Sequence, residues 1–233
     1  MEHHSYPETG QLQASNTAAL AKAFLNKVYL WMAGCMLLTA GVAAYCAQDL
    51  ATILWVQDNQ GLIAIGTIVM VVIMSFGTNR LSAGALTVLL LAFAGIQGLL
   101  FGPLLLAYKL PAVTKAFACT AVMFGAMSIY GATTKRNLGA WGRGLLMMLI
   151  GLIVATIINI FWGNGIMDFI ISCVGIVIFS CFTAYHTQSL LELGTCEDET
   201  VRAKGAVMGA LALYLDFINL FLILLPFFGG RDE

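Results

Sequence analysis

Residues 205–228 read GAVMGALALYLDFINLFLILLPFF, a run of 24 residues in which Asp216 is the only charged side chain. About 20 mostly apolar residues are enough for a helix to cross the hydrocarbon core of a bilayer. The apolar residues are continuous and do not alternate with polar ones, which excludes a strand of a membrane β-barrel. The segment therefore predicts a transmembrane helix that carries one carboxylate near its middle.

Six further apolar runs precede this one, at residues 28–47, 60–78, 84–108, 112–134, 143–162 and 166–190. The composition agrees, because 60% of the chain is hydrophobic and only 10% is charged, whereas soluble domains are about 45–50% apolar and about 25% charged. The connections are short, so consecutive spans lie antiparallel. We predict an all-α membrane bundle of seven transmembrane helices over residues 22–230, preceded by a polar, disordered tail at residues 1–21.

Positive charges are distributed unevenly between the two sides of this bundle. If the N-terminus is cytoplasmic, that side carries eight basic residues, namely Lys22, Lys27, Arg80, Lys135, Arg136, Arg143, Arg202 and Lys204. The other side carries three, namely Lys109, Lys115 and Arg231. Because short cytoplasmic loops are enriched in lysine and arginine, we predict a cytoplasmic N-terminus and a C-terminus outside.

The composition and the polar side chains also exclude several classes of function. A net charge of −1 offers no basic surface for nucleic acid. A catalytic zinc site needs about three protein ligands, whereas two of the three histidines, His3 and His4, lie in the N-terminal tail. Neither a glycine-rich phosphate loop nor a serine nucleophile elbow is present in the sequence. We therefore expect no enzyme and no cofactor, and the lipid bilayer as the principal partner.

Small residues in the third span indicate close helix packing. Gly98 and Gly102 lie four residues apart, a spacing that lets two helices approach closely in lipid and that also occurs in dimers. Pro103 follows directly and removes a backbone donor in mid-span. A loosened helix at membrane depth is tolerated beside protein or a water-lined cavity. The three residues therefore predict a packing face, with a pathway-lining element as the alternative.

Polar side chains at membrane depth are expensive and are usually functional. Asp216 is followed by Asn219 on the same helical face, and His186 lies near the inner end of the sixth span. A buried Asp216 requires a cation or a proton. Arg80, at the inner end of the second span, either supplies that cation or extends to the interface, and His186 either belongs to this polar group or caps its helix in water. This group predicts an ion pathway controlled by protonation.

Three segments resemble the Bax inhibitor-1 family, and most closely its bacterial inner-membrane branch. They are GLLFGP at 98–103, AYHTQ at 184–188 and YLDFINLF at 214–221. The resemblance extends over about residues 22–230 and implies a central last helix surrounded by the other six. It also implies a pH-sensitive calcium leak, in which two aspartates of the last two helices form a latch near an arginine of the second helix.

Carried onto this chain, the resemblance assigns the second aspartate to Asp216 and the arginine to Arg80, with a transient calcium contact at Asp216. The first aspartate should stand in a Tyr-Asp-Thr-Gln motif, where this sequence has His186. The alternative class of function is a non-conducting membrane protein that modulates a membrane protease or a secretion complex. Calcium flux through the purified protein distinguishes the two.

The histidine changes the physics of such a latch. Two close carboxylates share a proton and repel each other once it is lost, so a carboxylate pair opens as the pH rises. His186 and Asp216 attract each other when both are charged, and the attraction weakens when acid protonates Asp216 or when alkali neutralises His186. We therefore predict the tightest latch in an intermediate pH window. The site is also less favourable for calcium, which prefers oxygen ligands and negative charge.

The predicted spans place these two side chains at different depths. The sixth span ends near Leu191, about five residues beyond His186, and the seventh starts near Gly205, about eleven residues before Asp216. At about 1.5 Å per residue the difference in depth is about 9 Å. A direct contact requires the sixth span to extend past Leu191 or the seventh to start near Gly209 or later. We predict such a shift, with residues 194–200 forming a longer inner loop between the two spans.

Overall fold

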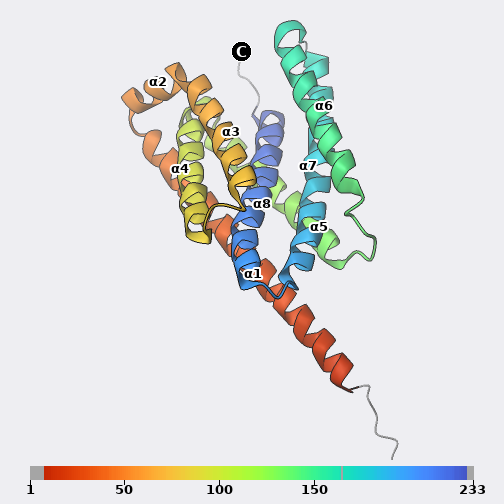
Figure 1. Cartoon of the computed structure of the whole chain (residues 1–233). Helices are drawn as coiled ribbons and strands as arrows, with labels where there is room; N and C mark the ends of the chain where they lie inside the picture. The colour runs from red at the N-terminus through yellow and green to blue at the C-terminus, as the bar shows by residue number, and fades with distance from the viewer. Residues whose placement is uncertain (1–7, 164, 230–233) are drawn as a thin grey trace, which may run out of the picture.

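The computed structural model describes residues 8–163 and 165–229, which fold into eight helices without a strand (Figure 1). The helices are α1 (Glu8–Cys46), α2 (Leu50–Asp58), α3 (Gln60–Gly77), α4 (Ala83–Ala107), α5 (Leu110–Thr133), α6 (Trp141–Trp162), α7 (Gly165–Gly194) and α8 (Glu199–Phe228). All of them except α2 are long and apolar enough to cross a membrane. The prediction of an all-α bundle with seven transmembrane helices is confirmed.

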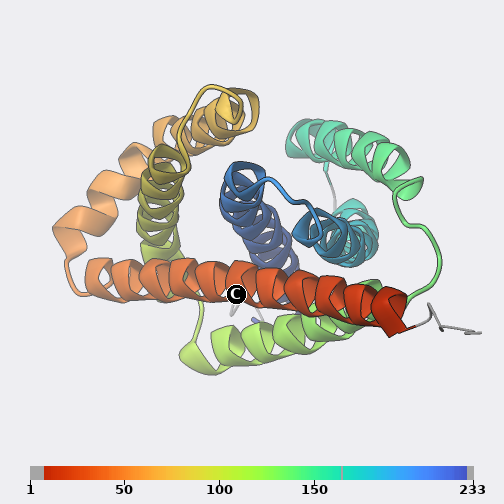
Figure 2. The same ribbon diagram turned by 60° about the horizontal axis from the view of Figure 1, so that its bottom comes forward.

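Helix α8 is the central and most buried span of the bundle. It packs against α1, α4, α5 and α7, whereas α3 packs mainly on α4 and α6 on α7. Figure 2 shows α3 and α6 on either side of α8, at the edge of the molecule away from α1. The start of α1 and the end of α8 lie at opposite ends of the bundle (Figure 1). Four of the six other spans therefore lie directly against the central helix.

The N-terminal part of the chain differs from the sequence prediction. Helix α1 begins at Glu8, so residues 8–21 are helical and do not form the disordered tail that we predicted. Residues 1–7 of that tail lie outside the described residues. Alanine, leucine and lysine at 18–25 favour helix, and extending an existing helix costs little compared with starting one. Ala21 and Phe24 also pack on Gly194 of α7, which holds this turn in place.

Helix α2 lies in the segment that the sequence predicts as a connection between the first two spans. Its nine residues are too few to span a bilayer. Asp49 caps its first turn, and the hydrogen bonds from Thr52 and Ala51 hold the pKa of Asp49 below its usual range. Ile53 is buried, whereas Trp55 is exposed, and tryptophan is enriched at membrane interfaces. The helix connects α1 to α3 and carries α3 away from α1.

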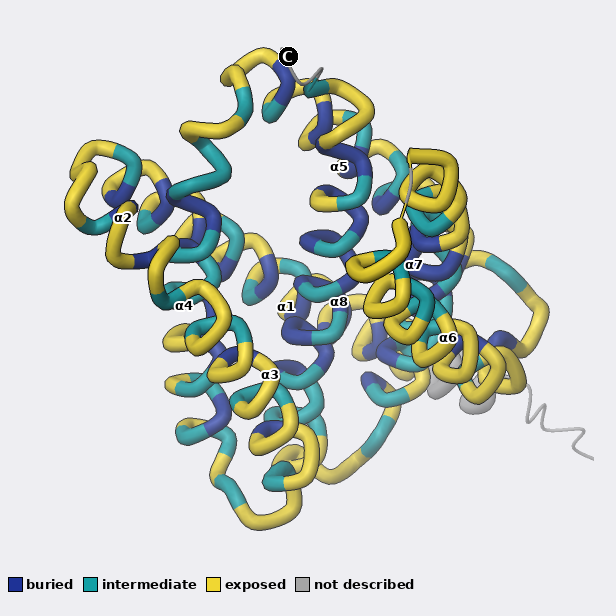
Figure 3. Tube along the Cα trace, turned by 90° about the horizontal axis from the view of Figure 1, so that it is seen from above, coloured by how far each residue is buried: buried dark blue, intermediate teal, exposed yellow. Residues whose placement is uncertain are grey.

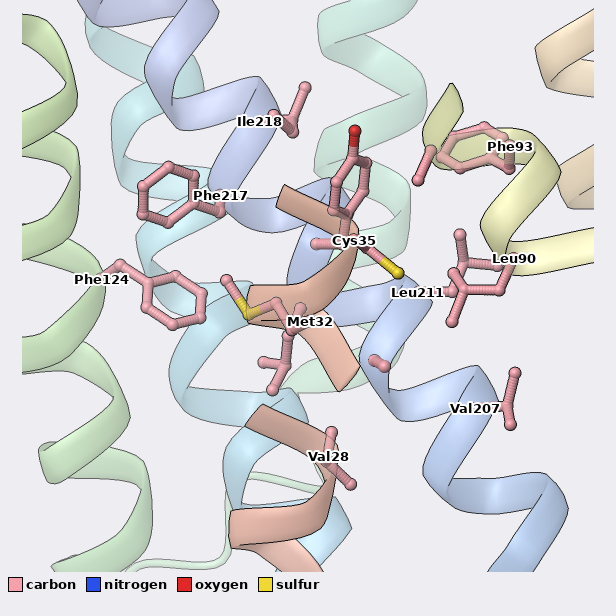
Figure 4. Packing of buried hydrophobic residues seen from close by; sticks show 14 of the residues in the cluster. Val28, Met32, Cys35, Leu90, Phe93, Phe124, Val207, Leu211, Phe217 and Ile218 are labelled. Carbon is pink, nitrogen blue, oxygen red and sulfur yellow. The ribbon is translucent and has the colours of Figure 1, made fainter. Parts of the chain in front are cut away.

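The core lies around α8 and is built mainly from apolar side chains of α1, α4, α5 and α8, with Met74 of α3 and Leu190 of α7. Figure 4 shows Val28, Met32 and Cys35 of α1, Leu90 and Phe93 of α4, Phe124 of α5, and Val207, Leu211, Phe217 and Ile218 of α8. Exposed residues dominate the outside of the bundle (Figure 3), and many of them are large apolar side chains such as Phe76 and Phe161. Such a surface suits lipid and not water.

The small residues of α4 form the contact with α1. A Cβ atom added to Gly98 would lie 2.6 Å from Val42 Cβ and 2.8 Å from the Thr39 carbonyl oxygen, and one added to Gly102 would lie 3.0 Å from Cys46 Cβ. Pro103 lies inside α4, which nevertheless continues to Ala107. Gly98 and Gly102 thus serve packing within the chain, and their face is already occupied by α1.

This contact leads to a prediction with a matched control. We expect Gly98→Ala to lower the free energy of unfolding by about 1–3 kcal/mol, because the added methyl group overpacks the α1–α4 interface. Gly95, one turn earlier in α4, has nothing within 4 Å of an added Cβ. Gly95→Ala should therefore be neutral or stabilise the protein by about 0.5–1 kcal/mol. Thermal unfolding of both purified variants tests this, and equal midpoints would contradict the close approach at Gly98.

Candidate functional site

His186 of α7 and Asp216 of α8 are in direct contact. The distance between His186 Nδ1 and Asp216 Oδ2 is 2.7 Å. The Asp216 side chain is only 5% exposed, and that of His186 is 26% exposed. The ring of Phe182, one turn earlier in α7, stacks on the imidazole with ring centroids 5.3 Å apart and an interplanar angle of 17°. The imidazole is thus held by an aromatic ring on one face and by a carboxylate at Nδ1.

The end of α7 and the start of α8 explain how His186 and Asp216 come to similar depths in the bundle. Helix α7 extends to Gly194, past Leu191, as one of the two predicted shifts requires. The other shift and the longer inner loop are wrong, because α8 begins at Glu199 and only residues 195–198 connect the helices. A Cβ atom added to Gly205 would meet the side chain of Leu193, so residues 199–204 run past the end of α7.

This pairing removes about half of the predicted difference in depth. His186 lies eight residues from Gly194, and Asp216 lies eleven residues from Gly205. The remaining difference of three residues corresponds to about 4.5 Å along the helices. A histidine side chain and an aspartate side chain together bridge that distance. The direct contact is therefore a consequence of the long α7 and of the close packing at its last turn.

The contact lies in a cavity with a volume of about 860 Å³. Side chains of α3, α4, α6, α7 and α8 form its walls, and nearly all of them are apolar. Its polar groups are Thr67, Gln97, Thr156, Ser172, His186, Asp216 and Asn219. Ile68 and Val72 of α3 and Ile153 and Ile157 of α6 line the cavity and are about half exposed. The cavity therefore opens to the lipid-facing surface along α3 and α6.

Asn219 lies one turn beyond Asp216 on the cavity side of α8. Its Nδ2 donates to the carbonyl oxygen of Leu215, one turn earlier in the same helix, over 2.8 Å. The predicted shared face of Asp216 and Asn219 is therefore present, since both line the cavity. Gln97 of α4 lines it as well. Gly98, Gly102 and Pro103 do not line it, which agrees with packing and not with the pathway alternative.

Arg80 does not join this site in the structure. It is exposed in the turn after α3 and is not among the residues that line the cavity. In the described part of the chain, the Asp216 carboxylate contacts His186 and forms no ion pair with a lysine or an arginine. At the same turn, Lys204 of α8 donates to the carbonyl oxygen of Thr78 over 2.9 Å.

The position of Lys204 gives the physical reason. Lys204 and Asp216 are twelve residues apart in α8, which corresponds to about 18 Å along the helix. The turn that contains Arg80 is level with Lys204, so its guanidinium is far from the carboxylate. The alternative, in which Arg80 extends to the interface, agrees with its exposure. The role of Lys204 in holding this turn was not evident from the sequence, where the residue contributed only to the charge distribution.

The other residues of the segment 185–188 position His186. The Tyr185 ring packs over Gly142 of α6, where an added Cβ atom would lie 2.8 Å from its hydroxyl oxygen. The hydroxyl groups of Thr187 and Tyr29 are 3.2 Å apart. Gln188 Oε1 accepts a hydrogen bond from the backbone N–H of Leu138 over 2.7 Å, and its Nε2 donates to the Arg136 carbonyl over 2.9 Å. These contacts fix α7 to α1, to α6 and to the connection before α6.

A buried hydrogen-bond chain lies on the side of α8 opposite Asp216. Thr39 Oγ1 donates to the carbonyl oxygen of Ala94 over 2.8 Å, so it accepts a hydrogen bond from the Tyr214 hydroxyl, 2.7 Å away. The Tyr214 side chain is fully buried. This chain connects α1, α4 and α8 two residues before Asp216. Sequence reasoning missed it, and a tyrosine inside an otherwise apolar run was the available signal.

Comparison with known proteins gives one family and several similar bacterial chains. Residues 21–233 match the family described as inhibitor of apoptosis-promoting Bax1. The chain is 38% identical over 217 residues to the inner membrane protein YbhL of Escherichia coli K12, covering 90% of this chain and 92% of that protein. It is 39% identical over 214 residues to a protein of Deinococcus radiodurans, covering 91% and 92% of the two chains. A protein of Rickettsia prowazekii is 35% identical over 219 residues, covering 91% of each chain.

Proposed function

Because the chain belongs to the Bax inhibitor-1 family, we propose that it is a proton-modulated calcium leak of the bacterial inner membrane. The observation that carries this proposal is the 2.7 Å contact between His186 and Asp216 at the cavity. The inner membrane is proposed from the similarity to an inner membrane protein of E. coli. The proposal involves no catalytic step.

Asp216 is the group that attracts the cation in this proposal. It is the only carboxylate among the described residues that line the cavity, and no lysine or arginine lines it. Calcium prefers oxygen ligands, and Asp216 and the amides of Asn219 and Gln97 supply oxygen atoms there. Within residues 8–163 and 165–229, no group of three or more histidine, cysteine, aspartate or glutamate side chains is placed to hold a metal. This supports a transient contact with passing calcium as the substrate.

His186 is the group that responds to protons. His186 and Asp216 are the only titratable side chains among the described residues that line the cavity. When His186 is protonated and Asp216 is ionised, their attraction holds α7 against α8 and neutralises the carboxylate. When His186 loses its proton, Asp216 becomes free to bind a cation. When acid protonates Asp216, the attraction is also lost, but the negative charge is lost with it.

The direct test is the release of calcium from liposomes that contain the purified protein. We expect faster calcium efflux than from protein-free liposomes, with the lowest rate in an intermediate pH window and the highest rate on its alkaline side. Efflux equal to that of empty liposomes at every pH would contradict the leak. That result would favour the alternative, a non-conducting protein that modulates a membrane protease or a secretion complex.

The orientation of the protein is a separate prediction. The distribution of basic residues, eight against three, places the N-terminus in the cytoplasm and Glu233 outside. We expect an alkaline phosphatase fused after Glu233 to be active, because this enzyme matures only outside the cytoplasm. A fluorescent reporter at the N-terminus should be bright, and the same phosphatase fused there serves as the inactive control. Two cytoplasmic ends would contradict seven spans.

A further inference from the structure

The cavity beside Asp216 combines an apolar interior with a single buried carboxylate. Its volume of about 860 Å³ lies within the range of about 300–1,000 Å³ that is typical of small-molecule sites. Such sites are mostly apolar and contain a few convergent polar groups. We propose that this cavity binds a lipophilic amine, a protonated amine on an apolar body, with the ammonium group on Asp216. This goes beyond ion passage, because binding does not require that calcium crosses the protein.

The walls determine how such a molecule enters. Val72 of α3 and Ile153 of α6 line the cavity and are 46% and 50% exposed, on helices that border the bundle on either side of α8 (Figure 2). This surface is apolar and faces lipid. An amphiphilic molecule that has partitioned into the bilayer therefore reaches the cavity sideways, without leaving the membrane. A solute that stays in water does not have this lateral route from the bilayer.

The charge selects a cation over an anion or a neutral chain. Asp216 is 5% exposed, and no basic side chain other than His186 lines the cavity in the described residues. His186 contacts Oδ2 of the carboxylate, whereas Oδ1 accepts no hydrogen bond within the described part of the chain. An ammonium group supplies both the donor and the positive charge for Oδ1, and interactions of charge are strong in a medium of low dielectric constant. A fatty acid would bring a second negative charge beside Asp216.

The aromatic residues of the cavity favour the same ligand. Phe93 of α4 and Phe182 of α7 line it, and Phe182 already stacks on the His186 ring, which is cationic when protonated. Aromatic faces attract organic cations. The apolar body of the amine then lies along α6, on the aliphatic side chains around Ile153. An acyl chain of a lipid would use these walls but would leave the carboxylate without a partner.

The test measures binding of tritiated N,N-dimethyldodecylamine to the full chain in phosphatidylcholine nanodiscs, with empty nanodiscs as the blank. Dodecanol and dodecanoate, which have the same chain length, serve as neutral and anionic competitors. We expect saturable binding that depends on the protein, with dodecanol competing at least about tenfold more weakly than the unlabelled amine and dodecanoate more weakly still. Asp216→Asn should weaken amine binding at least about tenfold, because a charged hydrogen bond is lost.

Two further variants keep the test decisive. Ile153→Trp fills the cavity from a lipid-exposed position and should also weaken binding at least about tenfold, even if Asp216→Asn does not fold. Asp168→Asn makes the same exchange outside the cavity, where Asp168 accepts a hydrogen bond from Asn159, and should change affinity less than about twofold. Equal competition by the amine and dodecanol would overturn the proposal in favour of an acyl-chain site. Binding without calcium efflux would contradict only the leak.

Discussion

Replacing Asp216 with asparagine is expected to lower calcium efflux at least about tenfold, measured on the alkaline side where the wild-type leak is open. The substitution keeps the size of the side chain but removes the only carboxylate among the described residues that line the cavity. A carboxylate at membrane depth offsets much of the cost of bringing a cation there, and about 1.4 kcal/mol corresponds to a factor of ten. Efflux from liposomes loaded with a calcium indicator gives the rate.

The matched control for this variant is Asp168→Asn. Asp168 is an aspartate in the first turn of α7 that lies outside the cavity, so its replacement should leave efflux within about twofold of wild type. Thermal unfolding of both variants shows whether the bundle is intact. If efflux through a folded Asp216→Asn protein equalled that of wild type, calcium would not pass this carboxylate, and the proposed role of Asp216 would fail.

Replacing His186 with aspartate is expected to change the shape of the pH profile. The wild type should show a minimum, because His186 and Asp216 attract each other only while the histidine is protonated and the aspartate is ionised. The variant places two carboxylates at the same contact. These share a proton at low pH and repel each other once it is lost, so efflux should rise continuously as the pH increases. Efflux measured from acid to alkaline pH distinguishes a minimum from a continuous rise.

His186→Asn is the control for this exchange. It cannot carry a charge, so the pH minimum should disappear while the size of the side chain remains similar. Identical profiles for the wild type and for His186→Asp would show that His186 stands outside the gate. In that case the contact between His186 and Asp216 would serve only to hold α7 against α8.

Much of the fold follows from the sequence, because each span is set by its own apolar run. The run at 205–228 predicts the end of α8 at Phe228, whereas α8 begins six residues before the run, at Glu199. Helix α2 could not be predicted in this way. Its nine residues are too short for a hydropathy argument, and its cap at Asp49 is a local signal that many loops share.

The candidate site was predictable in part. A lone aspartate in an apolar run indicates a buried charge, and the family resemblance pairs that aspartate with His186. The prediction that Arg80 lies near Asp216 is not met for a different reason. Arg80 lies in the turn after α3, and the position of that turn depends on how α3 packs against the other helices. Only the tertiary contact between Lys204 and Thr78 fixes that turn. Local sequence determines which residues are at membrane depth, whereas packing between distant helices determines which of them meet.

The hydrogen-bond chain from Tyr214 to Ala94 has a consequence for the route of protons. A proton wire works only if each member can both give and take a proton in turn, and a backbone carbonyl oxygen can do neither at ordinary pH. The chain ends on the Ala94 carbonyl, so its hydrogen bonds are donated in one direction only, from Tyr214 to Thr39 and from Thr39 to Ala94. These donors cannot turn round after a proton transfer. This chain therefore cannot carry protons to Asp216, whose contact with His186 lies on the cavity side of α8, where the imidazole is 26% exposed.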